Sequence, residues 1–126
     1  MSQLMIVALV PDLLTSVRVE SAAQRLGARL IAVESESELA QELSRGGATL
    51  AIIDLGYGGL DLMYAVEACV KERVPVLAFG PHADAGRLRD ARRAGAEFVY
   101  PRSKFMADAT SCLREALATG AKAQTA

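Results

Sequence analysis

The sequence predicts a single α/β domain in which a doubly wound, five-stranded parallel sheet lies between layers of helices. Three observations support this fold class. Short apolar runs alternate with segments of helical periodicity along all 126 residues, and this alternation is typical of parallel α/β sheets. Apolar residues make up 52% of the chain and aromatic residues only 5%, so the core is expected to consist of Ala, Val, Leu and Ile. Short turns join the segments, which favours right-handed crossovers between parallel strands.

The first half of the chain opens with the pattern of two strands and two helices. Residues 3–10 form an apolar run that predicts a buried strand, and residues 29–33 predict a second, shorter one. A helix lies between them, because apolar residues recur there at helical spacing: Val19, Ala22, Ala23 and Leu26. Ser35 and Glu38 have the spacing of a capping box, so a second helix begins there and ends at the pair of glycines that follows.

The third strand is predicted at residues 50–53 and leads directly into Asp54. A continuous apolar run of this length, bounded by turn signals, suits a strand that is covered on both faces. A glycine-rich turn over residues 56–59 follows. Open α/β sheets bind their ligands at the carboxyl ends of such strands. Asp54 is therefore the first candidate for a functional residue.

The next segments predict one helix and two strands. Apolar residues at helical spacing indicate a helix from position 62 that ends before Pro75, because the residue preceding a proline avoids the helical region. Residues 74–79 then predict the fourth strand and residues 97–100 the fifth.

Two more helices complete the pattern. Residues 83–94 predict a helix with Leu88 as its only large apolar residue, so its packing should be the weakest of the five helices. Residues 104–119 predict the last helix, which carries a continuous apolar stripe. We therefore expect one domain over residues 1–119 and a frayed tail over residues 120–126.

Composition argues against several classes of protein. The two cysteines, Cys69 and Cys112, lack CxxC spacing and His82 is the only histidine, so a zinc-type site is not expected. Both cysteines fall on apolar helix faces and are expected to be small core residues in a reducing cytoplasm. There is no basic leader and no apolar run long enough to span a bilayer. The net charge of −1 gives no general case for nucleic acid or membrane.

Three motifs lie at the third and fourth predicted strands and before the fifth. The first consists, in order, of Asp54, Leu55, Gly56, Tyr57, Gly58, Gly59, Leu60, Asp61 and Leu62. The second covers residues 75–84, and the third is the Gly-Ala-acid run at residues 95–97. With these motifs the chain resembles, over essentially its whole length, response-regulator receiver domains, the flavodoxin-like phosphoacceptor modules of two-component signalling. The first motif matches the family's acid-Leu-x-x-Pro-Gly-Met-acid-Gly. The resemblance implies the receiver fold, with Asp54 at the phosphoacceptor position.

The chain departs from the family pattern mainly at the positions that bind the metal ion and the phosphoryl group in active members. Active members hold Mg²⁺ with a pair of acids after the first strand, and here only Asp12 matches that pair. Gly80 stands where the family has the Thr or Ser that bonds the phosphoryl group. The family's Lys corresponds to Arg102 in an ungapped alignment, or to Tyr100 if the following proline is matched instead. Because Mg²⁺ demands octahedral oxygen ligation, Asp12, Asp54 and Gly56 make at most a weak magnesium site.

Purely structural roles are the alternative for several of the residues that the resemblance singles out. Asp54 can cap the following helix or pair with Arg102, which would keep a positive charge beside it with a larger, planar head. Asp61 is expected to cap the third helix. His82 can be an ordinary exposed loop residue.

Two further features suggest binding. The glycine-rich turn at residues 56–59 suggests a phosphate cradle, but it follows the third strand and lacks the spacing of a dinucleotide-binding loop. A cluster of basic residues on the fourth predicted helix is either a solvated face or a docking surface, since receivers dock partners and dimer mates on the face built from the fourth helix, fifth strand and fifth helix. Its members, with the neighbouring aromatic residue, are Arg87, Arg89, Arg92, Arg93 and Tyr100.

We therefore expect a stand-alone, degenerate receiver that acts through protein–protein interaction in bacterial signalling. Conventional phosphorylation of Asp54 is expected to be impaired or absent, so no enzymatic activity beyond autophosphotransfer is anticipated. The expected partner is a histidine kinase or a downstream signalling protein, with a homodimer as another possibility. A working phosphoacceptor is the first alternative, and a module that binds a small ligand through the glycine-rich turn and His82 is the second.

Overall fold

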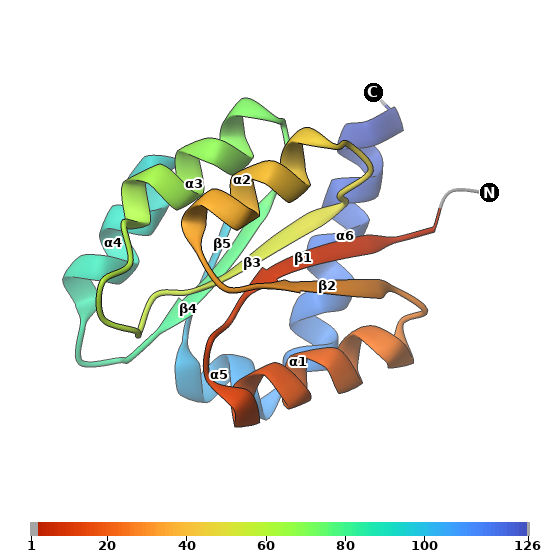
Figure 1. The fold of residues 1–126 in the computed structure, drawn as a ribbon. Coiled ribbons are helices and arrows are strands. Elements are labelled where there is room, and N and C mark those ends of the chain that lie inside the picture. The colour runs from red at the N-terminus through yellow and green to blue at the C-terminus, as the bar shows by residue number, and fades with distance from the viewer. Residues whose placement is uncertain (1–2, 126) are drawn as a thin grey trace.

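The computed structural model describes residues 3–125, with side chains described as far as residue 120. Five strands form one parallel sheet in the order β2-β1-β3-β4-β5 (Figure 1). The predicted fold class is therefore confirmed. The strands are β1 (Met5–Leu9), β2 (Arg29–Val33), β3 (Leu50–Asp54), β4 (Val76–Gly80) and β5 (Phe98–Pro101).

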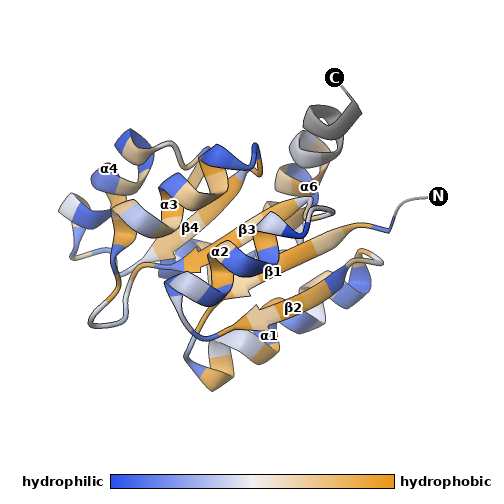
Figure 2. Cartoon of the chain, turned by 45° about the horizontal axis from the view of Figure 1, so that its top comes forward, coloured by the Kyte–Doolittle hydropathy of each residue, from blue (hydrophilic) through white to orange (hydrophobic). Residues whose placement is uncertain are grey.

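Helices cover both faces of this sheet (Figure 1). One layer consists of α2 (Glu36–Ser44), α3 (Leu62–Lys71) and α4 (Ala85–Ala94), and the other consists of α1 (Leu13–Arg25), α5 (Arg102–Ala107) and α6 (Ala109–Thr125). Alternate residues of each strand point to opposite faces, so a central strand contributes to both cores. In β3, Leu50 and Ile52 pack with the α1 layer while Ala51 and Ile53 pack with the α2 layer. Figure 2 shows these central strands as the most hydrophobic part of the chain.

The strand order places a topological switch point between β1 and β3. The chain moves outward from β1 to β2 and then returns to β3, from which it continues in the other direction. Residues at the carboxyl ends of β1 and β3 are therefore neighbours, and the register continues into β4, where Asp54 lies opposite Phe79. In open α/β sheets such a switch point is the position of the ligand crevice.

Polar caps begin four of the helices. Asp12, Ser35, Asp61 and Asp84 each accept a hydrogen bond from a backbone N–H in the first turn of the following helix. The predicted roles of Ser35 and Asp61 are thus confirmed. The Glu38 carboxylate accepts from the N–H of Glu34 at 2.7 Å, one residue before the position expected in a capping box.

The last predicted helix is wrong in one respect, because it is split into α5 and α6 at Asp108. That residue has φ −142° and ψ 41°, outside the helical region. The carbonyl oxygen of Met106 accepts hydrogen bonds from Nε (3.2 Å) and Nη2 (2.7 Å) of Arg18 on α1. This contact satisfies a carbonyl that the break leaves without an intrahelical partner. Sequence periodicity does not reveal the break, because the apolar stripe continues across it.

Helix α6 also extends beyond the predicted boundary at residue 119. It continues to Thr125, through most of the stretch predicted to be a frayed tail, while Ala126 lies outside the described residues. Gly120 is buried against Thr49, the residue before β3, and a Cβ at this position would overlap the backbone carbonyl of Thr49. The absent side chain therefore allows α6 to approach the sheet closely at its far end.

The other predicted elements agree with the structure to within a few residues. The first helix begins at Leu13, earlier than its apolar pattern, because Asp12 caps it there while Leu13 and Leu14 remain exposed. Helix α4 buries only Ala91 completely, as its weak pattern predicted. Cys69 and Cys112 are free and buried. None of the helices described is both long and apolar enough to cross a membrane.

The contact between Gly120 and Thr49 gives a test of the fold. Replacing Gly120 by Ala should lower the free energy of unfolding by about 1–3 kcal/mol through overpacking, although helix propensity alone predicts a gain of about 1 kcal/mol. Gly86→Ala is the matched control, since Gly86 lies in α4 with no atom closer than 3.9 Å to the new Cβ, and it should be neutral or stabilising. Urea denaturation measures both, and a stabilised Gly120→Ala variant would contradict the packing.

Candidate functional site

A polar pocket lies at the switch point between β1 and β3. Its volume is about 540 Å³, and it is bordered by the segment after β1, the loop after β3 and the start of α5. The residues that line it are Pro11, Asp12, Thr15, Asp54, Gly56, Tyr57 and Arg102. Asp12, Asp54, Gly56 and Arg102 were all candidates from the sequence, and the fold brings them to this one pocket.

An ion pair between Asp54 and Arg102 is the central contact of the pocket. Nη2 of Arg102 lies 2.6 Å from Oδ1 of Asp54. The same oxygen accepts a hydrogen bond of 2.8 Å from the backbone N–H of Gly56. Only 2% of the Asp54 side chain is exposed, so the carboxylate is removed from bulk water. A buried charge of this kind requires a partner, and Arg102 supplies it.

Two further contacts fix the guanidinium group of Arg102. Nη1 donates a hydrogen bond of 3.2 Å to Oγ1 of Thr15 on α1. The guanidinium carbon lies 5.1 Å from the ring centroid of Phe79, at a distance typical of a cation–π contact. Phe79 is itself stacked on Phe105, with ring centroids 4.6 Å apart. Arg102 is thus held by β3, α1 and β4 together.

Gly56 provides the space that this arrangement needs. A Cβ at this position would lie 2.8 Å from Nη2 of Arg102, 3.1 Å from Oδ1 of Asp54 and 3.2 Å from Cδ of Pro81. A side chain here would push the guanidinium away from Asp54. The first glycine of the turn therefore accommodates the guanidinium of Arg102.

Asp12 faces the same pocket but is engaged as a helix cap. Its Oδ2 accepts hydrogen bonds from the backbone N–H of Thr15 (2.9 Å) and from the hydroxyl of Thr15 (2.5 Å). These two bonds, with a smaller contribution from the charge of Arg102, lower the pKa of Asp12 below its ordinary value of 3.8. Asp12 is therefore ionised and is connected to Arg102 through Thr15.

The arrangement does not fit a magnesium site of the kind that the family resemblance implies. Mg²⁺ requires several oxygen ligands in octahedral geometry. Here one oxygen of Asp12 binds Thr15, one oxygen of Asp54 binds Arg102, and a fixed cation already lies beside both carboxylates. No cluster of three or more metal-ligating side chains occurs among the described residues.

The loop after β3 is fixed from both sides. The Tyr57 hydroxyl donates a hydrogen bond of 2.9 Å to Glu36 at the start of α2. Burial and this bond raise the pKa of Tyr57, so its hydroxyl is protonated at neutral pH. On the other side, Nε of Arg87 on α4 donates a hydrogen bond of 2.9 Å to the carbonyl oxygen of Leu55. Nη2 of Arg87 is buried and has no hydrogen-bond partner among the described residues.

The arginine cluster predicted on the fourth helix divides into two kinds of residue. Arg87 binds the loop after β3 through the carbonyl oxygen of Leu55. Nη2 of Arg92 donates a hydrogen bond of 3.2 Å to the carbonyl oxygen of Val99 on β5. Arg89 and Arg93 are exposed and form no ion pair within the described residues. The cluster is therefore partly structural, because Arg87 and Arg92 hold backbone carbonyls, whereas the side chains of Arg89 and Arg93 make no hydrogen bond among the described residues.

Tyr100 does not take the position beside Asp54. It packs with the core on the α1 side, and the Lys104 ammonium lies 5.8 Å from its ring centroid. Burial, as the main cause, raises the pKa of Tyr100 to about 12. His82 is exposed in the loop after β4 and does not line the pocket.

Gly80 leaves no hydroxyl at the end of β4. A Cβ at this position would lie 3.1 Å from the Cβ of Leu55, so Leu55 already occupies the space in which a threonine or serine side chain would begin.

Thr15 and Phe79 are the site residues that sequence reasoning missed. Thr15 follows Asp12 at the spacing of a helix cap, which was a usable signal. The sequence places Phe79 at the end of the fourth strand, and nothing in it indicates that an arginine lies on the ring.

Comparison with known proteins gives a likeness of structure alone. No family model matches the chain, and no curated protein matches it. A response regulator from Thermotoga maritima superposes with a TM-score of 0.78 at 15% identity, over 92% of this chain and 98% of that one. The signal receiver domain of an HD domain-containing protein from Pseudomonas fluorescens superposes with a TM-score of 0.85 at 12% identity, over 99% of this chain and 94% of that one. The chain has the fold of response-regulator receiver domains.

A third receiver structure bears on the pocket. The receiver domain of a sensor histidine kinase from Pseudomonas aeruginosa superposes with a TM-score of 0.77 at 18% identity, over 92% of this chain and 98% of that one. That protein has a magnesium ion coordinated in its active-site cleft. The present chain shares its receiver fold and places an arginine beside the acidic residues of the pocket.

The hydrogen bonds of Thr15 give a test of the pocket. In Thr15→Val the pKa of Asp12 should rise toward its ordinary value, because the variant keeps the backbone bond but loses the hydroxyl bond that favours the ionised form. NMR titration of the Asp12 carboxyl carbon measures this shift. Since folding lowers this pKa, Asp12 stabilises the protein above its unfolded-state pKa, and the contribution disappears as pH falls through the folded-state value.

Ser16→Ala is the control for this variant, because the Ser16 side chain makes no described hydrogen bond, and the pKa of Asp12 should not change. An unchanged Asp12 pKa in Thr15→Val would show that the hydroxyl bond is absent in solution.

Proposed function

We propose that the chain is an atypical receiver, a pseudo-receiver, that works by protein–protein contact in bacterial two-component signalling in the cytoplasm. Magnesium-dependent phosphorylation of Asp54 is impaired or absent in this proposal. The observation that carries it is the contact of 2.6 Å between Arg102 and Asp54, because the pocket already contains a positive charge bound to the residue at the acceptor position.

The chemistry of phosphoryl transfer explains why this contact matters. Transfer to a carboxylate requires an oxygen that can reach the phosphorus atom, and cations that stabilise the charge on the transferred group. Oδ1 of Asp54 is held by two donors, Arg102 and the Gly56 N–H. The single acid after β1, Asp12, is occupied by Thr15. Both the reach of the Asp54 oxygen and the binding of a metal ion are therefore weakened in this proposal.

The route by which receivers respond to phosphorylation is also altered. The resemblance implies a hydroxyl at the end of β4 that follows the phosphoryl group, and this chain has Gly80 there with Leu55 filling the adjacent space. A pocket that holds its own cation and lacks this hydroxyl favours one constant conformation. In the proposal, the partner surface is presented without phosphorylation.

The proposed partner surface lies on the face formed by α4, β5 and α5. Arg89 and Arg93 are exposed there, with Lys104 at the start of α5. An acidic surface on a histidine kinase or a downstream protein fits this charge, which would favour fast association and selectivity over raw affinity. The same face is the one that would mediate a homodimer.

A working phosphoacceptor is the second candidate. It is favoured by the position of Asp54 at the carboxyl end of β3, beside Asp12 in one pocket, and by the magnesium ion in the Pseudomonas aeruginosa receiver of the same fold. In that case Mg²⁺ binds only after Arg102 leaves Asp54, and the activity is limited to autophosphotransfer. No other enzymatic activity is proposed.

Phosphorylation of the intact protein separates the two candidates. After incubation with Mg²⁺ and acetyl phosphate, mass spectrometry should show no phosphate-sized increase in the wild-type chain. Asp54→Asn is the control for adducts at other sites. Robust labelling of the wild type that is lost in Asp54→Asn would refute the pseudo-receiver and establish the phosphoacceptor.

Magnesium affinity tests the role of Arg102 directly. In the wild type the positive charge of Arg102 repels Mg²⁺ from Asp54 and Asp12. Arg102→Ala removes this charge, so the variant should bind Mg²⁺ at least tenfold more tightly than the wild type. The amide signal of Gly56 reports binding in an NMR titration. Arg89→Ala, which removes an exposed arginine of α4, should leave the affinity unchanged. Equal affinities of the wild type and Arg102→Ala would contradict the proposed exclusion.

A further inference from the structure

A second polar cavity lies between α1 and the junction of α5 with α6, apart from the Asp54 pocket. Its volume is about 370 Å³, within the range of about 300–1,000 Å³ that is usual for small-molecule sites. Its base contains two buried alanines, Ala22 and Ala109, whose small side chains leave the space between the helices open. It shares no lining residue with the Asp54 pocket.

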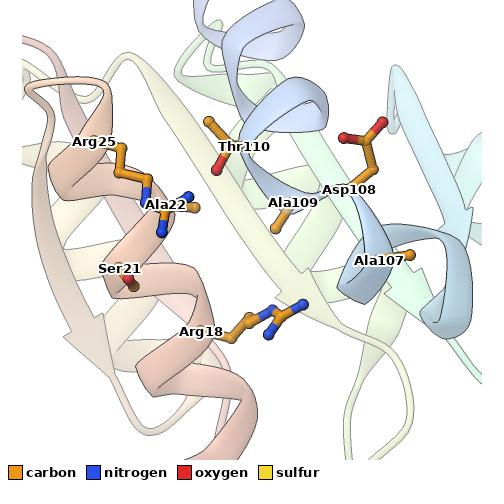
Figure 3. A pocket seen from close by; sticks show the side chains of 8 residues that line it. All are labelled: Arg18, Ser21, Ala22, Arg25, Ala107, Asp108, Ala109 and Thr110. Carbon is orange, nitrogen blue, oxygen red and sulfur yellow. The ribbon is translucent and has the colours of Figure 1, made fainter.

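The walls of this cavity carry two arginines from one face of α1. Arg18 and Arg25 are seven residues apart and both line it, as helical periodicity requires for residues on one side. Neither forms an ion pair within the described part of the chain. Figure 3 shows the guanidinium of Arg25 extending back along the helix toward Ala22, and that of Arg18 reaching across toward α5.

Arg18 is held in place by the break between α5 and α6. Its Nε and Nη2 donate to the carbonyl oxygen of Met106. A guanidinium has five N–H donors, so three remain for a ligand. Because the Met106 contact fixes its orientation, less conformational freedom is lost when a ligand binds.

Hydroxyl groups and the start of α6 complete the lining. Ser21 on α1 and Thr110 in the first turn of α6 both line the cavity. Figure 3 shows the Thr110 hydroxyl directed into the space between the helices, while the carboxylate of Asp108, the only acid in the lining, points away from both arginines. The polar groups that face the cavity are therefore cationic or hydrogen-bonding, and apart from Asp108 the remaining lining residues are alanines.

We propose that this cavity binds a phosphate group, either as free phosphate or as part of a small phosphorylated metabolite. Two guanidinium groups match the charge and the oxygen geometry of phosphate, which arginine binds through paired N–H donors. The hydroxyls of Ser21 and Thr110 supply neutral donors. Both arginines are exposed, so solvent screening limits the affinity of a single phosphate group to the millimolar range.

NMR titration of the full chain with inorganic phosphate and with pyrophosphate tests the site, with sodium chloride used to hold ionic strength constant. Saturable shifts of the Ala109 and Thr110 amides are expected, with pyrophosphate binding more tightly than phosphate. Arg25→Gln should weaken pyrophosphate binding about tenfold, the effect of losing a hydrogen bond to a charged group. Arg25 donates no described hydrogen bond, so the variant should fold normally.

Two control variants distinguish this cavity from the other charged regions of the protein. Arg89→Gln takes the same charge from α4 on the opposite face of the sheet and should leave pyrophosphate binding unchanged. Asp54→Asn should also leave it unchanged, so a failure of the pseudo-receiver proposal does not affect this result.

Three outcomes would overturn the proposal. The first is equal pyrophosphate binding by Arg25→Gln and the wild type. The second is shifts confined to Gly56 and its neighbours, which would place the anion at Arg102. The third is tighter binding of a triglutamate peptide than of pyrophosphate at the same two amides, which would make the cavity a docking point for an acidic protein segment.

Discussion

The buried ion pair between Asp54 and Arg102 is the interaction on which the rest of the site depends. Asp54 is at the end of the central strand and is almost completely buried, so its charge needs compensation within the protein. Arg102 supplies this from the start of α5, and the contacts of its guanidinium with Thr15 and Phe79 connect four elements around one carboxylate. Loss of the arginine would leave a buried charge without its cationic partner at the carboxyl end of the central strand.

The pseudo-receiver that we propose rests on this ion pair. Arg102 already offsets the negative charge of Asp54 that a bound metal ion would otherwise offset. Unlike a metal ion, the arginine is part of the chain and does not dissociate from the protein. The absence of a side chain at Gly56 keeps the guanidinium in contact with Asp54. The family resemblance implies a hydroxyl at the position of Gly80, and this chain has none there. Residues on three segments thus support the pseudo-receiver that we propose.

Helix α1 connects the two polar cavities of the molecule. Thr15 on its first turn contacts Arg102 at the start of α5, and Arg18, one turn later, contacts Met106 at the end of α5. The short helix α5 is therefore held at both ends by one helix of the same layer. The break at Asp108 separates α5, whose first residue lines the Asp54 pocket, from α6, which packs closely against Thr49 at Gly120.

Local sequence patterns were enough to predict the strands, most helix boundaries, the caps at Ser35 and Asp61, and the position of Asp54 at a strand end. These features depend on local periodicity and on residues a few positions apart. Only the folded chain shows that Arg102, and not Tyr100, meets Asp54, that Thr15 and Phe79 hold it there, and that the last helix breaks at Asp108. Those contacts join residues up to 88 positions apart, and their formation depends on which side chains the sheet order brings within hydrogen-bonding distance.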